Sequence, residues 1–269
     1  MPHKINELEK DCSLSSIVRL TEDWLMLPEM RLSSSLASHY ASVYGQVIQT
    51  AKALGLRETK YPNYADYDAV VIFGSTGLSY FKILQDLIYF YERNQLTWTK
   101  IILLGGDRPV NIQYDSLRTA YRYFPELFNR QIADEEIAAC TNEMDVMNMV
   151  TSVIKFPDAF KSIPIESLLT HKNPGEKSQA STHDTLVKLL KHYKFSGELP
   201  ILFLGTLPYI VRQGLQAKML MPDYKVDTAY MFGRYLETID TALKGDLPAA
   251  LYLDEFHCLF YNMNLYDTD

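Results

Sequence analysis

Three glycine-containing turns are the first places in the sequence where chemistry is expected, because each follows a short apolar run. The turns are Gly74-Ser75-Thr76-Gly77, Gly105-Gly106-Asp107-Arg108 and Gly205-Thr206. Glycine lets a ligand approach the backbone closely, and the first turn of a following helix offers unpaired N–H groups that suit an anion. The alternative for any one turn is that glycine only makes a tight connection between strand and helix. Three such turns at one sheet edge favour a ligand site.

A second group of candidate residues lies in the acidic segment 134–145. Thr141 or Asn142 can cap a following helix, and Glu143 in its first turn is favoured by the helix dipole. Capping does not explain Glu135, which we expect to end a short strand at the same sheet edge. Carboxylates brought together in this way can bind a cation or carry out acid–base catalysis. The residues expected to converge on one cleft are Asp107, Arg108, Glu135 and Glu143.

Several well-known cofactor and catalytic motifs are absent from the sequence. The first glycine turn lacks both the Lys-Ser/Thr ending of a P-loop and the three-glycine spacing of a dinucleotide fingerprint. There is no Gly-x-Ser-x-Gly nucleophile elbow. The six histidines and three cysteines are scattered, without the spacing of a zinc site or a disulfide framework. No metal is therefore expected, and the sequence does not identify a cofactor.

Apolar runs and amphipathic helices alternate along the centre of the chain and must position these residues. Predicted strands cover Ala69–Phe73, Lys100–Leu104 and Leu199–Leu204, with a weak one at Gln131–Ala133. Predicted helices cover residues 78–93, 116–124, 143–156, about 186–193, about 207–221 and 228–244. Continuous apolar strands separated by helices indicate a parallel sheet covered on both faces. We therefore expect a three-layer α/β/α, Rossmann-like fold with a mainly parallel sheet.

The two ends of the chain add to this core. Apolar residues recur at helical spacing over residues 17–27 and 34–53. We expect residues 1–60 to form a helical extension packed on the core and residues 61–269 to form the Rossmann-like domain, compact as a whole. The segment 249–260 fits either a strand or a further C-terminal helix. Residues 171–182 contain no large apolar side chain, so we expect an exposed loop, either a plain connector or a lid.

Composition excludes several classes of protein. The 269 residues carry 33 acidic and 26 basic side chains, and a net charge of −7 argues against a nucleic-acid partner. The apolar runs are far shorter than the roughly 18 residues that a membrane span needs. The N-terminus is charged and has no apolar signal-peptide stretch, which favours a cytoplasmic protein. A bacterial protein exported without a cleaved signal peptide has the same appearance.

The order of these motifs resembles the SanA/YdcF/ElyC-like group, a Rossmann-like domain of largely unknown function in bacterial envelope-related and cytosolic proteins. Members begin with a strand of the type D-A-[IV]-V-V-L-G, which is similar to residues 68–74 here. Their second strand ends in Ser-Gly-Gly, which is similar to residues 104–106. Their third motif is E-x5-T-x-E-N, and Glu135, Thr141 and Glu143 match its spacing.

The chain also departs from the pattern of this family. Met144 stands where the family has Asn, and Cys140 stands where another Asn precedes the Thr. The last family motif is T-S-x-x-H-x-x-R. Aligning Arg212 with its Arg places Thr206 at the Ser position and Tyr209 at the His position. The resemblance implies a divergent member whose activity is altered or lost.

Two functions from different classes follow from the sequence. The first is a small-molecule site for a nucleotide-like or phosphorylated ligand, with hydrolysis or group transfer as its chemistry. The second is a non-enzymatic interaction protein that kept the fold, lost the His and Asn groups of the family, and uses exposed tyrosines as contacts. The candidate catalytic residues are Glu135, Glu143 and Tyr209. The candidate ligand-binding residues are Gly74, Ser75, Thr76, Gly77, Lys82, Gly105, Gly106, Asp107, Arg108, Thr141, Thr206 and Arg212.

Overall fold

The computed structural model divides the chain into two compact units. The larger unit is Thr59–Ile239, and the smaller unit joins Met1–Glu58 to Asp240–Asp269. The predicted α/β domain over residues 61–269 therefore differs from the structure in its C-terminal part. The residues that the structure describes are 13–24, 41–75, 77–109, 121, 124–171, 181–232 and 249–266.

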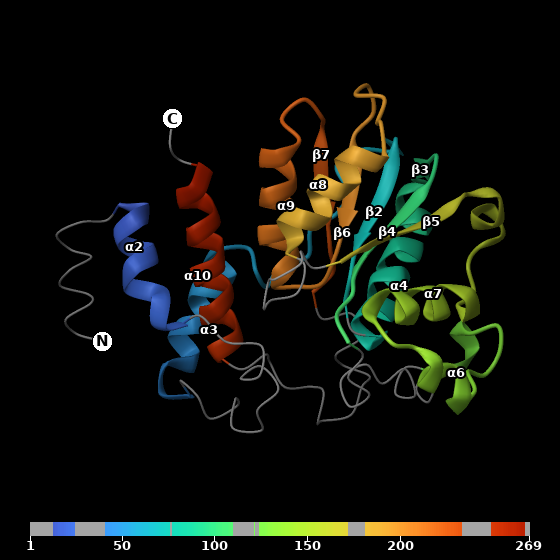
Figure 1. Ribbon diagram of the computed structural model, residues 1–269, viewed down its shortest axis with the longest axis horizontal. Helices are drawn as coiled ribbons and strands as arrows, with labels where there is room; N and C mark the ends of the chain where they lie inside the picture. Colours follow the sequence, from blue (N-terminus) through green and yellow to red (C-terminus); the bar gives the residue numbers. More distant parts are fainter. Residues whose placement is uncertain are drawn as a thin grey trace. The chain divides into compact units, whose positions relative to one another are not determined.

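The larger unit is built on a five-stranded sheet in which all neighbouring strands are parallel (Figure 1). Its strands are β2 (Ala69–Phe73), β4 (Ile101–Gly106), β5 (Ile165–Thr170), β6 (Ile201–Leu204) and β7 (Val226–Ala229). They lie in the spatial order β5-β4-β2-β6-β7. Along the chain, β4 and β5 are added on one side of β2, and β6 and β7 are then added on its other side. The order reverses between β2 and β6, the point where open α/β sheets usually bind ligands.

Helices cover both faces of the sheet, which confirms the predicted three-layer α/β/α fold. The covering helices are α4 (Gly77–Asn94), α7 (Glu143–Val153), α8 (Thr182–His192) and α9 (Tyr209–Leu220). Because side chains alternate along a strand, Val70 and Ile72 pack with the buried residues of α4 and α7. Val71 and Phe73 pack on the opposite face with α8 and α9. Every residue of β2 is buried, as expected for a central parallel strand.

Both margins of the sheet make polar contacts with neighbouring segments. At the β5 margin, Lys188 Nζ in α8 donates a hydrogen bond to the Leu169 carbonyl oxygen. At the β7 margin, Lys60 pairs with Tyr230 in antiparallel fashion through two backbone hydrogen bonds of 2.9 and 3.0 Å. These contacts engage backbone groups that an open strand edge otherwise leaves unpaired.

The smaller unit is helical in its described part. Its elements are α2 (Leu14–Thr21), η1 (Glu22–Trp24), η4 (Ala41–Val43), α3 (Tyr44–Ala53) and α10 (Ala249–Tyr266). The segment 249–260 is therefore a helix, and it packs against α2, η1 and α3, which explains why it groups with the N-terminal residues. The contact between α2 and α10 includes a 3.0 Å hydrogen bond that joins Thr21 Oγ1 and His257 Nδ1. No helix in the described ranges is long and apolar enough to span a membrane.

Several predicted elements need correction. The predicted strand at Gln131–Ala133 is wrong, because these residues form no strand and α6 (Asp134–Ala139) begins directly after them. A helix starting at residue 228 is also wrong, because Thr228 and Ala229 belong to β7. The strand β5 was not predicted. The predicted helix over 116–124 and the predicted loop over 171–182 lie largely outside the described residues.

The remaining described elements are short. A two-stranded parallel sheet consists of β1 (Asp66–Tyr67) and β3 (Thr97–Trp98). Short 3-10 helices are η5 (Pro125–Leu127) and η6 (Asp158–Ser162). Trp98 in β3 contacts the ring of Phe160 in η6 edge-on, at a centroid distance of 5.1 Å. These rings extend the hydrophobic core on the face of α4 and α7.

A buried carboxylate fastens the start of the larger unit to β7. Asp227 is only 2% exposed and accepts hydrogen bonds from Asn63 N at 2.8 Å, Asn63 Nδ2 at 2.6 Å and Tyr67 Oη at 2.7 Å. Lys60 Nζ lies 3.8 Å from the same carboxylate. Burial and the bond to Asp227 raise the pKa of Tyr67 above its usual range, so its hydroxyl stays a donor. A buried charge is tolerated here because donors surround it.

We expect Asp227→Asn to lower the free energy of unfolding by about 2–4 kcal/mol, because it removes the charge and turns an amide toward existing donors. Chemical denaturation of both proteins measures the difference. The exposed Asp223→Asn is the matched control and should stay within about 0.5 kcal/mol of the wild type. Equal stability of the two variants would contradict this role for Asp227.

Candidate functional site

The C-terminal ends of β2, β4, β5 and β6 meet at one edge of the sheet because these strands are parallel. Gly74 and Ser75 follow β2, Asp107 follows β4, and Gly205 and Thr206 follow β6. Of the predicted residues in the first turn, Gly77 is the first residue of α4 and Thr76 lies outside the described residues. The predicted placement of the three turns at a common edge is therefore correct.

Glu143 is the group around which this edge is organised. It is the first residue of α7, and its Oε2 accepts a 3.0 Å hydrogen bond from Gly106 N at the end of β4. Its Oε1 lies 3.3 Å from Arg108 Nε, and its backbone N–H donates to the Arg108 carbonyl at 2.9 Å. The Glu143 side chain is only 14% exposed. The start of α7 is thus tied to the turn after β4 by backbone and side chain together.

Two of the predicted ligand-binding glycines make room for α7. A Cβ added at Gly74 would overlap the Glu143 carboxylate and lie 3.1 Å from the Leu104 carbonyl oxygen. A Cβ added at Gly105 would lie 2.8 Å from Met144 Cε and 3.3 Å from its Cα. These positions need glycine for packing, whether or not a ligand binds.

Gly106 differs from these two glycines. The nearest described atoms to an added Cβ are Glu143 Oε2 at 3.6 Å and Arg108 N at 3.8 Å, which are ordinary contact distances. Packing of the described residues therefore does not require glycine at this position. An added Cβ would make ordinary van der Waals contact with the Glu143 side chain, so the described contacts allow alanine here.

The first residues beyond β4 and β5 also meet. Asp107 N donates a 3.1 Å hydrogen bond to the Thr170 carbonyl, and Asp107 Oδ2 lies 3.5 Å from His171 Nδ1. Sequence reasoning missed Thr170 and His171 because it missed β5. The apolar pair Leu168-Leu169 at the end of a short β-like run was the available signal.

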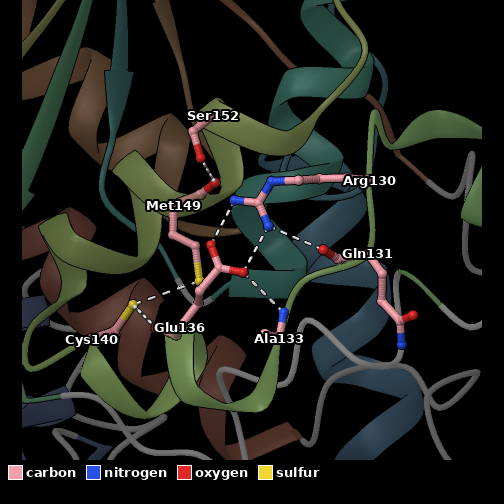
Figure 2. Close-up of polar contacts among 7 residues, drawn as sticks. All are labelled: Arg130, Gln131, Ala133, Glu136, Cys140, Met149 and Ser152. Atoms are coloured by element: carbon pink, nitrogen blue, oxygen red, sulfur yellow. Dashed lines mark hydrogen bonds and ion pairs between the residues drawn. The ribbon is translucent and has the colours of Figure 1, made fainter.

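Figure 2 shows the contacts that Glu136 makes near the start of α6. Arg130 holds Glu136 with two contacts, Nη1–Oε2 at 2.7 Å and Nη2–Oε1 at 2.6 Å, and Ala133 N donates to Glu136 Oε2 at 3.0 Å. The bond to Arg130, followed by that from Ala133, lowers the pKa of Glu136 to about 2. The Cys140 thiol lies 3.8 Å from Met149 Sδ on the neighbouring helix.

Two predicted residues of this segment do not contact Glu143. Thr141 donates from Oγ1 and N to Asp145 Oδ2, at 2.7 and 2.8 Å, so it supports the start of α7. The N-cap itself is Asn142, whose Oδ1 accepts from Asp145 N at 3.0 Å. Glu135 is exposed in α6 and makes no hydrogen bond or ion pair with the described residues. Its predicted place at a strand end is wrong, because that strand does not form.

The remaining candidates lie on α4 and around the start of α9. Lys82 is half-buried in α4, and burial lowers its pKa, an effect that Asp86 partly offsets. Thr206 accepts a 3.0 Å hydrogen bond from Ile210 N at the start of α9. Tyr209 and Arg212 are half-buried in the first turn of that helix. They follow β6, on the other side of the point where the strand order reverses.

We expect Gly74→Ala to destabilise the protein by about 1–3 kcal/mol, because the added methyl group displaces the Glu143 carboxylate. The cost should fall clearly in a Glu143→Ala background, where the overlapping group is gone, and a denaturation double-mutant cycle measures this coupling. Gly45→Ala in α3 is the control, since its Cβ meets no atom within 4 Å. Equal costs of Gly74→Ala in both backgrounds would rule out the proposed fit.

The Glu136–Arg130 pair predicts a dependence of stability on pH. Because the pKa of Glu136 is lowered from 4.5 to about 2, its contribution is full above pH 4.5 and is lost as pH falls toward 2. The Tm of Glu136→Gln should lie below that of the wild type at pH 7 and approach it near pH 2. The exposed neighbour Glu135→Gln is the control and should show little such convergence. A Tm gap that stays constant with pH would contradict the ion pair.

The described residues do not include a group of three or more His, Cys, Asp or Glu side chains that could hold a metal ion. Cys140 and Cys258 are not part of a disulfide bond. No protein family, no curated protein and no solved structure matches the chain. The candidate site is accordingly defined by its own geometry: the Glu143 carboxylate, the Arg108 guanidinium and the Asp107–His171 pair, at the carboxyl ends of β4 and β5.

Proposed function

We propose that the C-terminal edge of the sheet binds a small nucleotide-like or phosphorylated ligand. The observation that carries this proposal is the junction of Glu143, Arg108 and the Gly106 backbone at the end of β4. Charged side chains gather there at the edge of an open parallel sheet, beside the strand at which the order reverses. In open α/β proteins, ligands bind in the crevice outside the carboxyl ends of the strands, where the strand order reverses.

Different groups at this edge would bind different parts of such a ligand. Arg108 and, across β2 and β6, Arg212 supply counter-charge for an anionic group. The first turns of α4 and α9 supply backbone N–H groups, which attract anions at the positive end of the helix dipole. Both side-chain oxygens of Glu143 contact donors, which suits an ionised carboxylate. As chemistry we propose hydrolysis or group transfer, in which Glu143 accepts the proton of the attacking hydroxyl or water.

Membership of the SanA/YdcF/ElyC-like group is part of this proposal. It is supported by the Asp68–Gly74 segment, which contains β2, and by the position of Glu143, the residue that matches the second Glu of the third motif. Under this reading the chain is a divergent bacterial, cytoplasmic member. The exposed position of Glu135 and the capping role of Thr141 leave Glu143 as the acidic residue on which activity depends.

An interaction protein is the second candidate, and one observation favours it. Tyr61 and Tyr64 are 42% and 48% exposed, and Arg93 lies over the Tyr61 ring at 5.3 Å from its centroid. Tyrosine and arginine are enriched at protein interfaces. Tyr61 also packs on Phe90 near the end of α4, and this helix begins at the site edge. The exposed pair Tyr61 and Tyr64, here called the tyrosine patch, and the candidate site therefore lie toward opposite ends of the strands.

A thermal-shift screen tests the first function on the full chain, using nucleotides, S-adenosylmethionine and sugar phosphates, each with and without divalent metal ions. We expect at least one compound to raise Tm, because a ligand at 100 times its Kd stabilises by about 2.7 kcal/mol. Glu143→Gln and Asp107→Asn should lose most of this shift. Glu135→Gln, an equivalent change on the exposed helix α6, should retain it.

Two results would count against the small-molecule function. One is the absence of a Tm shift with every compound, and the other is an undiminished shift in both Glu143→Gln and Asp107→Asn. Tyr61→Ala is a further control, because a change at the tyrosine patch should leave the ligand shift intact.

A further inference from the structure

The outer side of β5 leaves backbone hydrogen-bonding groups open. This strand forms one margin of the five-stranded sheet (Figure 1). The carbonyls of Pro164 and Thr170 accept hydrogen bonds from β4, so the alternate residues Ile165, Ser167 and Leu169 direct their backbone N–H and C=O groups away from it. No described residue bonds the outward groups of Ile165 or Ser167, and Ser167 is exposed. A further strand can therefore pair along this margin.

Leu169 differs from these two residues, because its carbonyl accepts a hydrogen bond from Lys188 Nζ in α8. A strand that pairs with Leu169 takes this carbonyl and displaces the ammonium group. The ammonium group then keeps a protein partner only if the incoming strand carries an acceptor, and a carboxylate is the strongest one. Lys188 therefore disfavours neutral strands and favours a strand with an acidic residue at the matching position.

A second copy of β5 has this property. If two copies of β5 run antiparallel about a two-fold axis at Ser167, Ile165 of each copy lies opposite Leu169 of the other, and the outward residues exchange backbone hydrogen bonds. Ile165 and Leu169 both pack on the core on the α7 side of the sheet, so this pairing joins two apolar side chains. Glu166 then lies opposite Leu168 of the second copy.

The charges of β5 and α8 match in the same arrangement. Glu166 and Leu168 project on the α8 side, because Glu166 forms a hydrogen bond with Tyr193, which directly follows α8, and Leu168 packs in the core of that face. A two-fold axis normal to the sheet keeps the α8 sides of both copies on one face. Glu166 is one residue away from the residue that pairs with Leu169, so it comes beside Lys188 of the other copy. The symmetry forms this ion pair twice.

We propose that the chain forms a symmetric homodimer in which two β5 strands pair antiparallel and extend the sheet from one copy into the other. Lys188 of each copy contacts Glu166 of the other. This pairing satisfies the open backbone groups and covers the β5 margin in both copies. It is independent of the proposed ligand site, whose residues follow the strands rather than lie along β5.

Sedimentation velocity of the full chain tests this assembly over a concentration series of about 1–200 μM. A six-residue strand with its flanking helices gives an interface at the small end of the usual range, so we expect dimerisation with a micromolar Kd. The weight-average mass should rise from that of one chain to that of two chains across the series.

Two charge variants identify the surface that is used. Lys188→Glu and Glu166→Lys should each weaken self-association about tenfold, because like charges then meet twice in the dimer. An equimolar mixture of the two variants should recover the wild-type affinity, because each copy presents the charge that the other lacks. Lys191→Glu, a change at an exposed residue of α8, is the matched control and should leave association unchanged.

Ser167→Pro tests the backbone part of the pairing. Proline removes the outward N–H and leaves the hydrogen bonds to β4 in place, which is why edge strands tolerate it. This variant should stay monomeric over the whole series. If it fails to fold, the mixture of the two charge variants alone decides.

Three results would overturn the dimer or its geometry. A monomer at every concentration overturns the proposal and leaves β5 open to an extended segment of another protein. A dimer that Lys188→Glu, Glu166→Lys and Ser167→Pro all retain overturns it as well, because association then uses another surface. Weakened association that the mixture does not recover overturns the antiparallel register, because Glu166 and Lys188 then do not meet between copies.

Discussion

The position of the Glu143 carboxylate is the constraint on which the C-terminal edge of this sheet depends. One carboxylate reaches from the first residue of α7 to the Gly106 backbone and the Arg108 side chain. The fit requires an unoccupied Cβ position at Gly74, and the adjacent Met144 requires another at Gly105. The start of α7 and the ends of β2 and β4 are therefore fixed together, so that a change in one moves the charges presented by the others.

The parts of the fold that sequence reasoning predicted well are those with strong local patterns. The strand Ala69–Phe73 is buried along its whole length and therefore reads as a continuous apolar run. The edge strands β5 and β7 were missed for the opposite reason. β5 carries Glu166 and Ser167 on a partly exposed margin, and β7 contains Asp227, whose charge is buried. The partners that make this burial tolerable are Asn63 and Tyr67, about 160 residues away, and local pattern does not show them.

The same distinction applies to the candidate site. Glu143, Arg108 and Gly106 were found because they flank a clear strand and a clear helix start. Glu135 was misplaced because the helix that contains it begins with the Glu136–Ala133 contact rather than after a strand. Thr170 was missed because β5, whose last residue it is, was missed. Tyrosines such as Tyr67 and Tyr80 are fully buried, so the high tyrosine content reflects packing as well as surface.

The contacts at the two outer strands of the sheet bear on whether the protein aggregates at high concentration. Lys188 Nζ donates to the Leu169 carbonyl of β5, and Lys60 pairs with Tyr230, the residue directly after β7. Unprotected outer strands recruit strands from other molecules and begin aggregates. Here a charged ammonium group stands at one margin, and a segment of the same chain pairs with the other. These contacts of its own sequence occupy one carbonyl of β5 and the backbone directly after β7, where they compete with pairing by another molecule.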